Sequence, residues 1–86
     1  MPYTYILYSE KLNKYYIGSC IDMDIRLRQH NSGVSKFTSL GIPWVVAYTE
    51  EYALLLEARR RELQIKRMKS RKYVEDLIAK GRASRS

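Results

Sequence analysis

The chain has 86 residues but only one cysteine, Cys20, and one histidine, His30. A single cysteine cannot form a disulfide within the chain, and these two residues cannot supply the ligands of a zinc site. A metal bound here would be a hard cation held by carboxylate oxygens and water. The fold must therefore be stabilised by its own hydrophobic core, and the cysteine usage predicts a cytoplasmic protein.

A chain of this length has room for one small domain, which buries only about 60% of the surface that its unfolded form exposes. A hydrophobic content of 45% and eight tyrosines argue against a disordered protein. No apolar segment approaches the ~18 residues of a membrane span, and the first residues lack the pattern of a signal peptide. We expect no membrane partner, one domain over residues 1–80, and a disordered polar tail over residues 81–86.

The formal net charge is +7, which predicts an anionic partner. Nucleic acid is the first choice, and a membrane surface or a charge that serves only solubility is the alternative. Eight of the sixteen bases lie within residues 59–72, where Glu62 is the single acid. A solvated basic helix face would explain the bases but not the acid among them.

Short runs of β-branched, aromatic and other apolar residues predict three strands, over residues 3–9, 15–21 and 44–49. The first two are joined by a short polar turn, so they form an antiparallel hairpin. Residues 34–43, which end in Pro43, are predicted as a loop.

Three helices are predicted, from capping residues and hydrophobic spacing. Asp22 caps a helix that runs to Asn31, a long helix spans residues 52–68, and Ser70 caps a last helix over residues 71–80 that stops at Gly81. The expected fold class is α/β (α+β), a small three-stranded antiparallel sheet flanked by three helices.

Two helices carry charged residues on their apolar faces. In the first, Arg26 and His30 stand four residues apart on the face that also holds Met23 and Leu27. In the long helix, Leu54, Ala58 and Ile65 mark the inward face, and Glu62 lies between the last two. Because buried charge is costly unless it is paired or functional, these positions indicate a site. The alternative is a structural Arg26–Glu62 salt bridge.

The strands add tyrosines and one glycine to this picture. Tyr3 and Tyr5 point to one side of the first strand, and Tyr16 and Gly18 share a side of the second. Most tyrosines in strands are half-buried packing residues with a solvated hydroxyl. A glycine inside a strand is destabilising, however, and indicates that another backbone or a ligand approaches closely.

Four segments together resemble the GIY-YIG nuclease domain: Tyr3-Thr4-Tyr5, Tyr16-Ile17-Gly18, the run from Arg26 to Asn31, and the run from Ala58 to Lys66. The closing segment, Lys69 to Glu75, is similar to that of the small single-domain bacterial members, the UPF0213-like branch. The resemblance extends from Tyr3 to about Ile78. The first motif has Tyr-Thr-Tyr where the family name has Gly-Ile-Tyr, but its tyrosine, Tyr5, is retained.

The resemblance implies a metal-dependent DNA endonuclease with a site made of Tyr5, Tyr16, Arg26, His30 and Glu62. Glu62 would bind one divalent cation, Mg²⁺ or Mn²⁺, and no small-molecule cofactor is expected. Tyr16 would act as the general base with Tyr5 beside it, although the two roles could be exchanged. Arg26 would clamp the scissile phosphate. His30 would orient a tyrosine hydroxyl or relay its proton; the alternative is a packing histidine.

The remaining bases would contact the phosphates of DNA, which position a duplex without specifying its sequence. These nucleic-acid-binding candidates are Arg28, Lys36, Arg59, Arg60, Lys66 and Arg67. Leu56 and Leu63, on the other side of the long helix, are expected to pack against the last helix. The family-level expectation is a role in DNA repair or recombination. Two alternatives stay open: a nucleic-acid-binding module without useful activity of its own, and an interaction domain.

Overall fold

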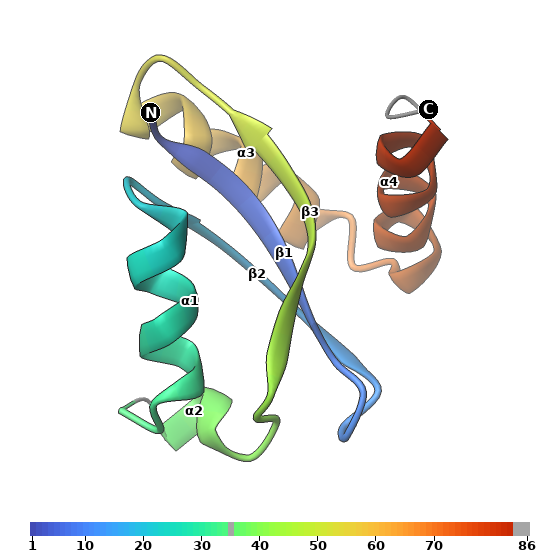
Figure 1. Cartoon of the computed structure of the whole chain (residues 1–86). Coiled ribbons are helices and arrows are strands. Elements are labelled where there is room, and N and C mark those ends of the chain that lie inside the picture. Colours follow the sequence, from blue (N-terminus) through green and yellow to red (C-terminus); the bar gives the residue numbers. More distant parts are fainter. Residues whose placement is uncertain (35, 84–86) are drawn as a thin grey trace.

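The computed structural model describes residues 1–34 and 36–83, which form three strands and four helices (Figure 1). The elements in chain order are β1 (Tyr3–Ser9), β2 (Lys14–Cys20), α1 (Met23–Asn31), α2 (Lys36–Ser39), β3 (Trp44–Glu51), α3 (Leu55–Arg67) and α4 (Arg71–Ala83). The α+β class, the antiparallel sheet and the three predicted helices are confirmed. The prediction of a continuous loop before β3 is wrong at one place, because α2 adds a single helical turn there.

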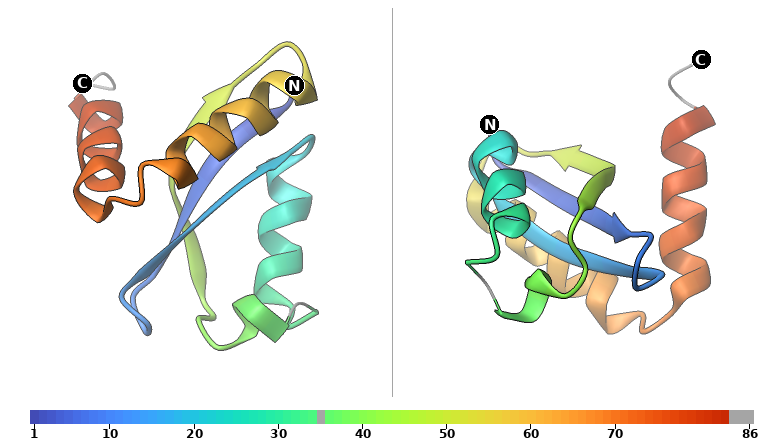
Figure 2. Two further views of the ribbon diagram at one scale, coloured as in Figure 1. Left: turned by 180° about the vertical axis from the view of Figure 1, so that it is seen from behind. Right: turned by 60° about the horizontal axis from the view of Figure 1, so that its bottom comes forward.

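The sheet has the strand order β2-β1-β3, and β1 pairs antiparallel with both neighbours. Because side chains alternate along β1, Tyr5 and Leu7 join one buried cluster with Trp44. Ile6 joins the other cluster, together with Ile65 of α3. Figure 2 shows α3 crossing the face of the sheet opposite α1. The central strand is thus buried from both sides.

A β-bulge interrupts the pairing of β1 with β3. Ile6 pairs with Tyr48 and Leu7 with Val46, so Ala47 is the extra residue. Simple alternation would place Trp44 on the same face as Tyr48 and Glu50. The bulge reverses the alternation, and Trp44 packs in the cluster on the α1 face while Tyr48 packs on the α3 face.

The predicted helix caps at Asp22 and Ser70 are confirmed. The Ile25 N–H donates to the Asp22 carboxylate at 3.0 Å, and the Tyr73 N–H donates to the Ser70 hydroxyl at 3.1 Å. The predicted start of the long helix is wrong: α3 begins at Leu55, because the strand before it continues to Glu51.

The C-terminal helix does not stop at Gly81 as predicted, because α4 continues to Ala83. A Cβ at Gly81 would lie 2.9 Å from Cδ1 of Tyr48, so the absence of a side chain permits close packing of α4 on β3. The predicted tail therefore begins within the helix, and residues 84–86 lie outside the described residues.

Three leucines of the long-helix region are not where the pattern placed them. Leu56 and Leu63 are 56% and 50% exposed, so they do not form the contact with α4. Leu54 is 61% exposed and precedes the helix. The cluster that joins α3 to α4 is built instead on Ile65, Val74 and Ile78. None of the described helices is both long and apolar enough to span a membrane.

Candidate functional site

The Tyr5 side chain lies directly over Gly18, its pairing partner on β2. A Cβ at Gly18 would lie 2.4 Å from Oη of Tyr5, a distance that no real side chain tolerates. A close approach at this glycine is therefore confirmed, but a tyrosine side chain makes it and not the backbone or ligand that was expected. Since β2 is an edge strand, the missing side chain lets the Tyr5 hydroxyl extend across β2.

Tyr5, Tyr16 and His30 form an aromatic cluster on the α1 face. Oη of Tyr5 and Nε2 of His30 are hydrogen-bonded at 3.0 Å, and both residues are buried. The Tyr16 ring centroid lies 4.8 Å from that of His30 and 6.4 Å from that of Tyr5. Three of the five predicted catalytic residues are thus brought together.

The electrostatics of the cluster differ between its members. Burial raises the pKa of Tyr5 well above its usual value, and the neighbouring Tyr16 adds to the effect, while Arg26 opposes it. Burial also lowers the pKa of His30, as does the positive charge of Arg26. At neutral pH the Tyr5 hydroxyl therefore keeps its proton and the His30 imidazole is uncharged.

Arg26 lies one helical turn before His30 on α1, and it is exposed. It lines a cleft together with Cys20, and its positive charge lowers the pKa of His30 and opposes the rise in the pKa of Tyr5 and Cys20. Within the described part of the chain, no ion pair joins Arg26 to Glu62. The alternative of a structural salt bridge between these two residues is therefore wrong.

Glu62 lies on the other side of β2. Its carboxylate accepts a hydrogen bond from the Ser19 hydroxyl at 2.6 Å and a second one from the Lys66 ammonium. Ser19 follows Gly18, so its side chain points to the α3 face while Tyr5 covers the α1 face. Glu62 nevertheless contributes to the raised pKa of Tyr5, so its charge is felt across the edge strand.

Two adjoining clefts along the edge of β2 share Ser19 and Arg59. One lies between α1 and α3 and includes Arg26, and the other includes Glu62. We refer to them together as the β2 groove. Arg26 of α1, Arg59 of α3 and the carboxylate of Glu62 thus line the β2 groove, whereas the residues of the aromatic cluster are not part of its lining.

The donor atoms around Glu62 suit a hard divalent cation. Its two carboxylate oxygens and the Ser19 hydroxyl are all oxygen ligands, and Mg²⁺ commonly takes only one or two protein carboxylates and completes its shell with water and phosphate. The described residues contain no cluster of three or more His, Cys, Asp or Glu side chains. A cation here would compete with the Lys66 ammonium for one carboxylate oxygen.

The predicted phosphate contacts are all exposed, but they do not lie on one surface. Arg59 lines the β2 groove, and Lys66 reaches it through its ion pair with Glu62. Arg28 and Lys36 belong to α1 and α2, on the other side of the sheet. The full set of exposed candidates is Arg28, Lys36, Arg59, Arg60, Lys66 and Arg67.

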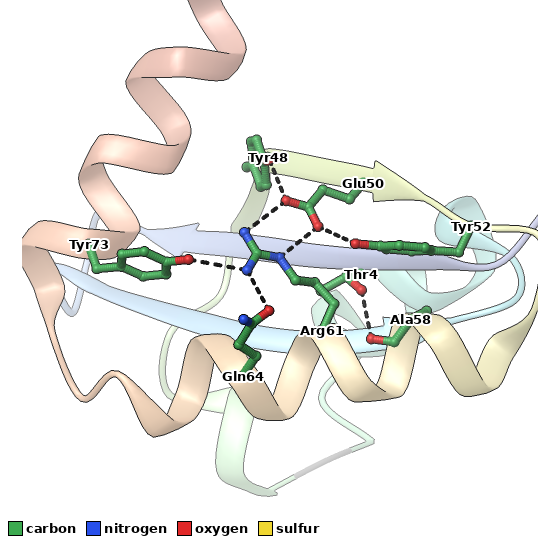
Figure 3. A network of polar contacts seen from close by, with 8 residues as sticks. All are labelled: Thr4, Tyr48, Glu50, Tyr52, Ala58, Arg61, Gln64 and Tyr73. Atoms are coloured by element: carbon green, nitrogen blue, oxygen red, sulfur yellow. Dashed lines mark hydrogen bonds and ion pairs between the residues drawn. The ribbon is translucent and has the colours of Figure 1, made fainter.

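One base of the same run has a structural role that the sequence did not reveal. The Arg61 guanidinium donates to the Glu50 carboxylate at 2.9 and 3.3 Å and to the Tyr73 hydroxyl at 3.1 Å (Figure 3). Tyr48 and Tyr52 donate to the same carboxylate at 2.5 and 2.7 Å. This Glu50 network connects α3 with β3 and α4. Arg61 stands three residues after the buried Ala58, a spacing that could have identified it.

Asn31 and Ser19 were also missed as positioning residues. The Asn31 amide donates to the Trp44 carbonyl at 3.0 Å and accepts from the Trp44 N–H at 2.6 Å. This pair fixes the end of α1, and with it His30, to the start of β3. Ser19 similarly fixes the orientation of Glu62.

The comparisons agree with this geometry. A family model described as the GIY-YIG catalytic domain matches residues 1–74. The solution NMR structure of the UPF0213 protein BH0048 from Bacillus halodurans is 33% identical and superimposes with a TM-score of 0.59. That match covers 94% of this chain and 87% of the other. No curated protein matches the sequence. The chain is a UPF0213-like protein and belongs to the GIY-YIG nuclease family.

Proposed function

We propose that this protein is a metal-dependent DNA endonuclease that hydrolyses a phosphodiester with water. GIY-YIG nucleases act on nucleic acid and generally use divalent metal ions. One observation carries the proposal for this chain: Tyr5, Tyr16 and His30 lie on one side of edge strand β2, Glu62 lies on the other, and Gly18 leaves no side chain over Tyr5. A phosphate in the β2 groove would be within reach of both the aromatic cluster and the Glu62 carboxylate.

Tyr16 is the better candidate for the general base. The raised pKa of Tyr5 keeps its hydroxyl protonated, and that hydroxyl is engaged with His30. Tyr16 is less buried and contacts the same imidazole with its ring. A tyrosine hydroxyl needs a nearby cation to give up its proton at neutral pH, and Arg26 supplies a positive charge. Tyr5 and His30 would then hold the cluster in place.

Glu62, oriented by Ser19, would hold Mg²⁺ or Mn²⁺. When bound, such a cation polarises a phosphate oxygen and stabilises the charge that develops there. Arg26 would bind the scissile phosphate through its planar guanidinium, and Arg59 would bind a neighbouring phosphate along the groove. The other exposed bases, including Arg28 and Lys36, would hold the duplex by contacts that carry no sequence information. The proposed setting is DNA repair or recombination in the cytoplasm.

The test is cleavage of labelled linear, nicked, flapped and branched DNAs in magnesium, manganese or EDTA. Wild-type protein should cut at least one substrate in a metal-dependent way, and Glu62→Gln should lose the activity while it still retains DNA. Glu51→Gln makes the same chemical change at an exposed position and is the control. Equal weak cutting by the wild type and Glu62→Gln would indicate contamination and would contradict the proposal.

One observation favours a second candidate, a catalytically weak nucleic-acid-binding module. The Lys66 ammonium neutralises the Glu62 carboxylate that would bind the cation. If this pair is never displaced, the protein would bind DNA with the steep loss of affinity in salt that counterion release produces, and would cut nothing. Binding that is insensitive to salt would contradict both candidates and would favour an interaction domain.

A further inference from the structure

A second cleft, of about 330 Å³, lies on the α3 side of the sheet, where the start of β2 meets the end of α3 and the start of α4. Four bases line it, Lys14, Lys66, Lys69 and Arg71, and no acidic residue does. Its apolar floor includes Ile17 and Ile65. We call it the basic cleft. Its volume is in the range of small-ligand sites, about 300–1,000 Å³.

Two of the four charges in the basic cleft are not balanced by an acid. In the described part of the chain, neither Lys14 nor Lys69 has an ion pair. Arg71 is held in place, because it donates to the Asn13 carbonyl and side chain, both at 2.7 Å. Its Nε–H also pairs with Glu75 at 3.4 Å, which leaves one N–H on each terminal nitrogen for an anion at little entropic cost. The cleft therefore combines an apolar floor with a preorganised cationic rim.

We propose that the basic cleft holds an unpaired nucleotide of the strand whose phosphate occupies the β2 groove, an inference that rests on the proposed nuclease function. A nucleotide has the required chemistry, since its base has an apolar face for Ile17 and Ile65 and its phosphates are anions for Lys14 and Lys69. An acidic peptide would satisfy the rim but leave the apolar floor without a partner. Base pairing would keep the nucleotide stacked in the duplex, so only an unpaired one can enter.

The basic cleft is connected to the β2 groove by the ion pair between Lys66 and Glu62. This lysine lines the cleft and forms the ion pair with Glu62, which precedes it by about one helical turn, about 5.4 Å. Phosphates of one strand are about 3.4 Å apart along a duplex axis, so this separation corresponds to one or two nucleotides. The substrate class that fits is DNA with a single-stranded tail, flap or gap beside the scissile phosphate.

The experiment measures binding without cleavage, by fluorescence anisotropy in EDTA. Wild-type protein is titrated with a blunt duplex and with the same duplex carrying a short unpaired dT tail. The tail should tighten binding about tenfold, within the range for a bound unpaired base. The double variant Lys14→Ala, Lys69→Asn should lose this preference, and its salt slope on the tailed duplex should fall by about 1.4.

Asparagine is chosen at position 69 because Lys69 has a φ of 47°, in the left-handed region that asparagine tolerates. Lys80→Ala, an exposed base of α4 outside the cleft, should keep the full preference for the tail. Circular dichroism checks that each variant is folded. The proposal is overturned if the tail does not tighten binding, if the double variant keeps the preference, or if a polyglutamate peptide competes at the cleft and the dT tail does not.

The two proposals fail separately in this design. Preference for the tail without cleavage in magnesium or manganese would contradict the nuclease and support the basic cleft as a binding site. Metal-dependent cleavage that is equal on blunt and tailed DNA, with equal binding, would support the nuclease and overturn the basic cleft.

Discussion

The Glu50 network and the β2 groove use the same residue types in opposite ways. The network contains one glutamate, one arginine and three tyrosines, and the groove with its aromatic cluster contains one glutamate, two arginines and two tyrosines. In the network, Arg61, Tyr48 and Tyr52 all donate to the Glu50 carboxylate. In the groove and its aromatic cluster, Glu62 accepts instead from Ser19 and Lys66, and Tyr5 is hydrogen-bonded to His30.

The two regions differ in whether the hydrogen-bonding partners of the carboxylate can be displaced. The four bonds to Glu50 fill its carboxylate, and its side chain and that of Arg61 are only 19% and 18% exposed. The Glu62 carboxylate has two partners, the Ser19 hydroxyl and the Lys66 ammonium. The Lys66 side chain is 47% exposed. A carboxylate whose partners are fixed stabilises a fold, whereas one with a displaceable partner can take a cation. Residue types alone do not distinguish the two.

The largest contrast should come from removing one tyrosine hydroxyl in each region. We expect Tyr16→Phe to slow cleavage by about 10²–10⁴, the usual contribution of a general base. Tyr48→Phe should leave cleavage unchanged and cost about 1–2 kcal/mol of unfolding free energy, because it removes a hydrogen bond to a charged group. Single-turnover rates and urea unfolding measure the two effects. A greater loss of rate in Tyr5→Phe than in Tyr16→Phe would show that the tyrosine roles are exchanged.

The two carboxylates should differ next in their effect on stability. Glu50→Gln leaves the Arg61 charge without its partner, and we expect a loss of about 2–3 kcal/mol, somewhat below that for a fully buried pair. Glu62→Gln should change the unfolding free energy by less, about 1 kcal/mol, since its ion-pair partner Lys66 is 47% exposed, although the Glu62 side chain is as little exposed as that of Glu50, at 19%. Equal losses in the urea midpoints of the two variants would remove the distinction between network and groove.

The pH dependence of stability tests the Glu50 network alone. Burial by itself would raise the pKa of Glu50, but the hydrogen bonds from Arg61, Tyr48 and Tyr52 outweigh it and hold this pKa below 4.5. A lowered pKa in the folded state stabilises the protein above the unfolded value and loses that contribution as the pH falls through the folded value. The difference in Tm between wild type and Glu50→Gln should therefore shrink below about pH 4.5. A constant difference in acid would contradict this assignment.

The smallest expected effect concerns the displaceable partner of Glu62. Lys66→Met removes the ammonium that competes with a cation, so the magnesium concentration for half-maximal cleavage should fall by a few-fold, an electrostatic change of about 1 kcal/mol. Affinity for DNA in EDTA should weaken at the same time, because Lys66 also lines the basic cleft. Arg67→Met, at an exposed position one residue further on, is the control for loss of charge. A higher magnesium requirement in Lys66→Met would mean that the lysine supports the cation instead of competing with it.

Local patterns predicted most of the fold. Strand alternation and the caps at Asp22 and Ser70 are decided by residues close together in the chain, so the hairpin and the helices follow from the sequence. The bulge at Ala47 depends on pairing between distant strands, and α2 is a single turn without a strong signal. The helix continues past Gly81 because the glycine contacts Tyr48, again a distant residue.

In the candidate site, too, local features could be predicted from the sequence and contacts between distant residues could not. Periodicity singled out Arg26, His30 and Glu62, but it could not show that α1 and α3 cover opposite faces of the sheet. Arg61 and Glu62 flank the stripe of Ala58 and Ile65 on its two sides, so both could point inward. Only the fold shows that Arg61 meets a carboxylate of β3 while Glu62 meets Ser19. The catalytic roles stay predictions until the substitutions are made.

The bulge at Ala47 has a consequence for how this protein can change in evolution. The alternation of side chains between the two faces of β3 reverses at this residue. Trp44 therefore lies on the α1 face and Glu50 on the α3 face. Substitution at position 47 alters one side chain. Deletion of that residue would restore simple alternation and send either the tryptophan or the Glu50 network to the wrong face. Insertions and deletions here are therefore far less tolerable than substitutions, although the position itself carries only alanine.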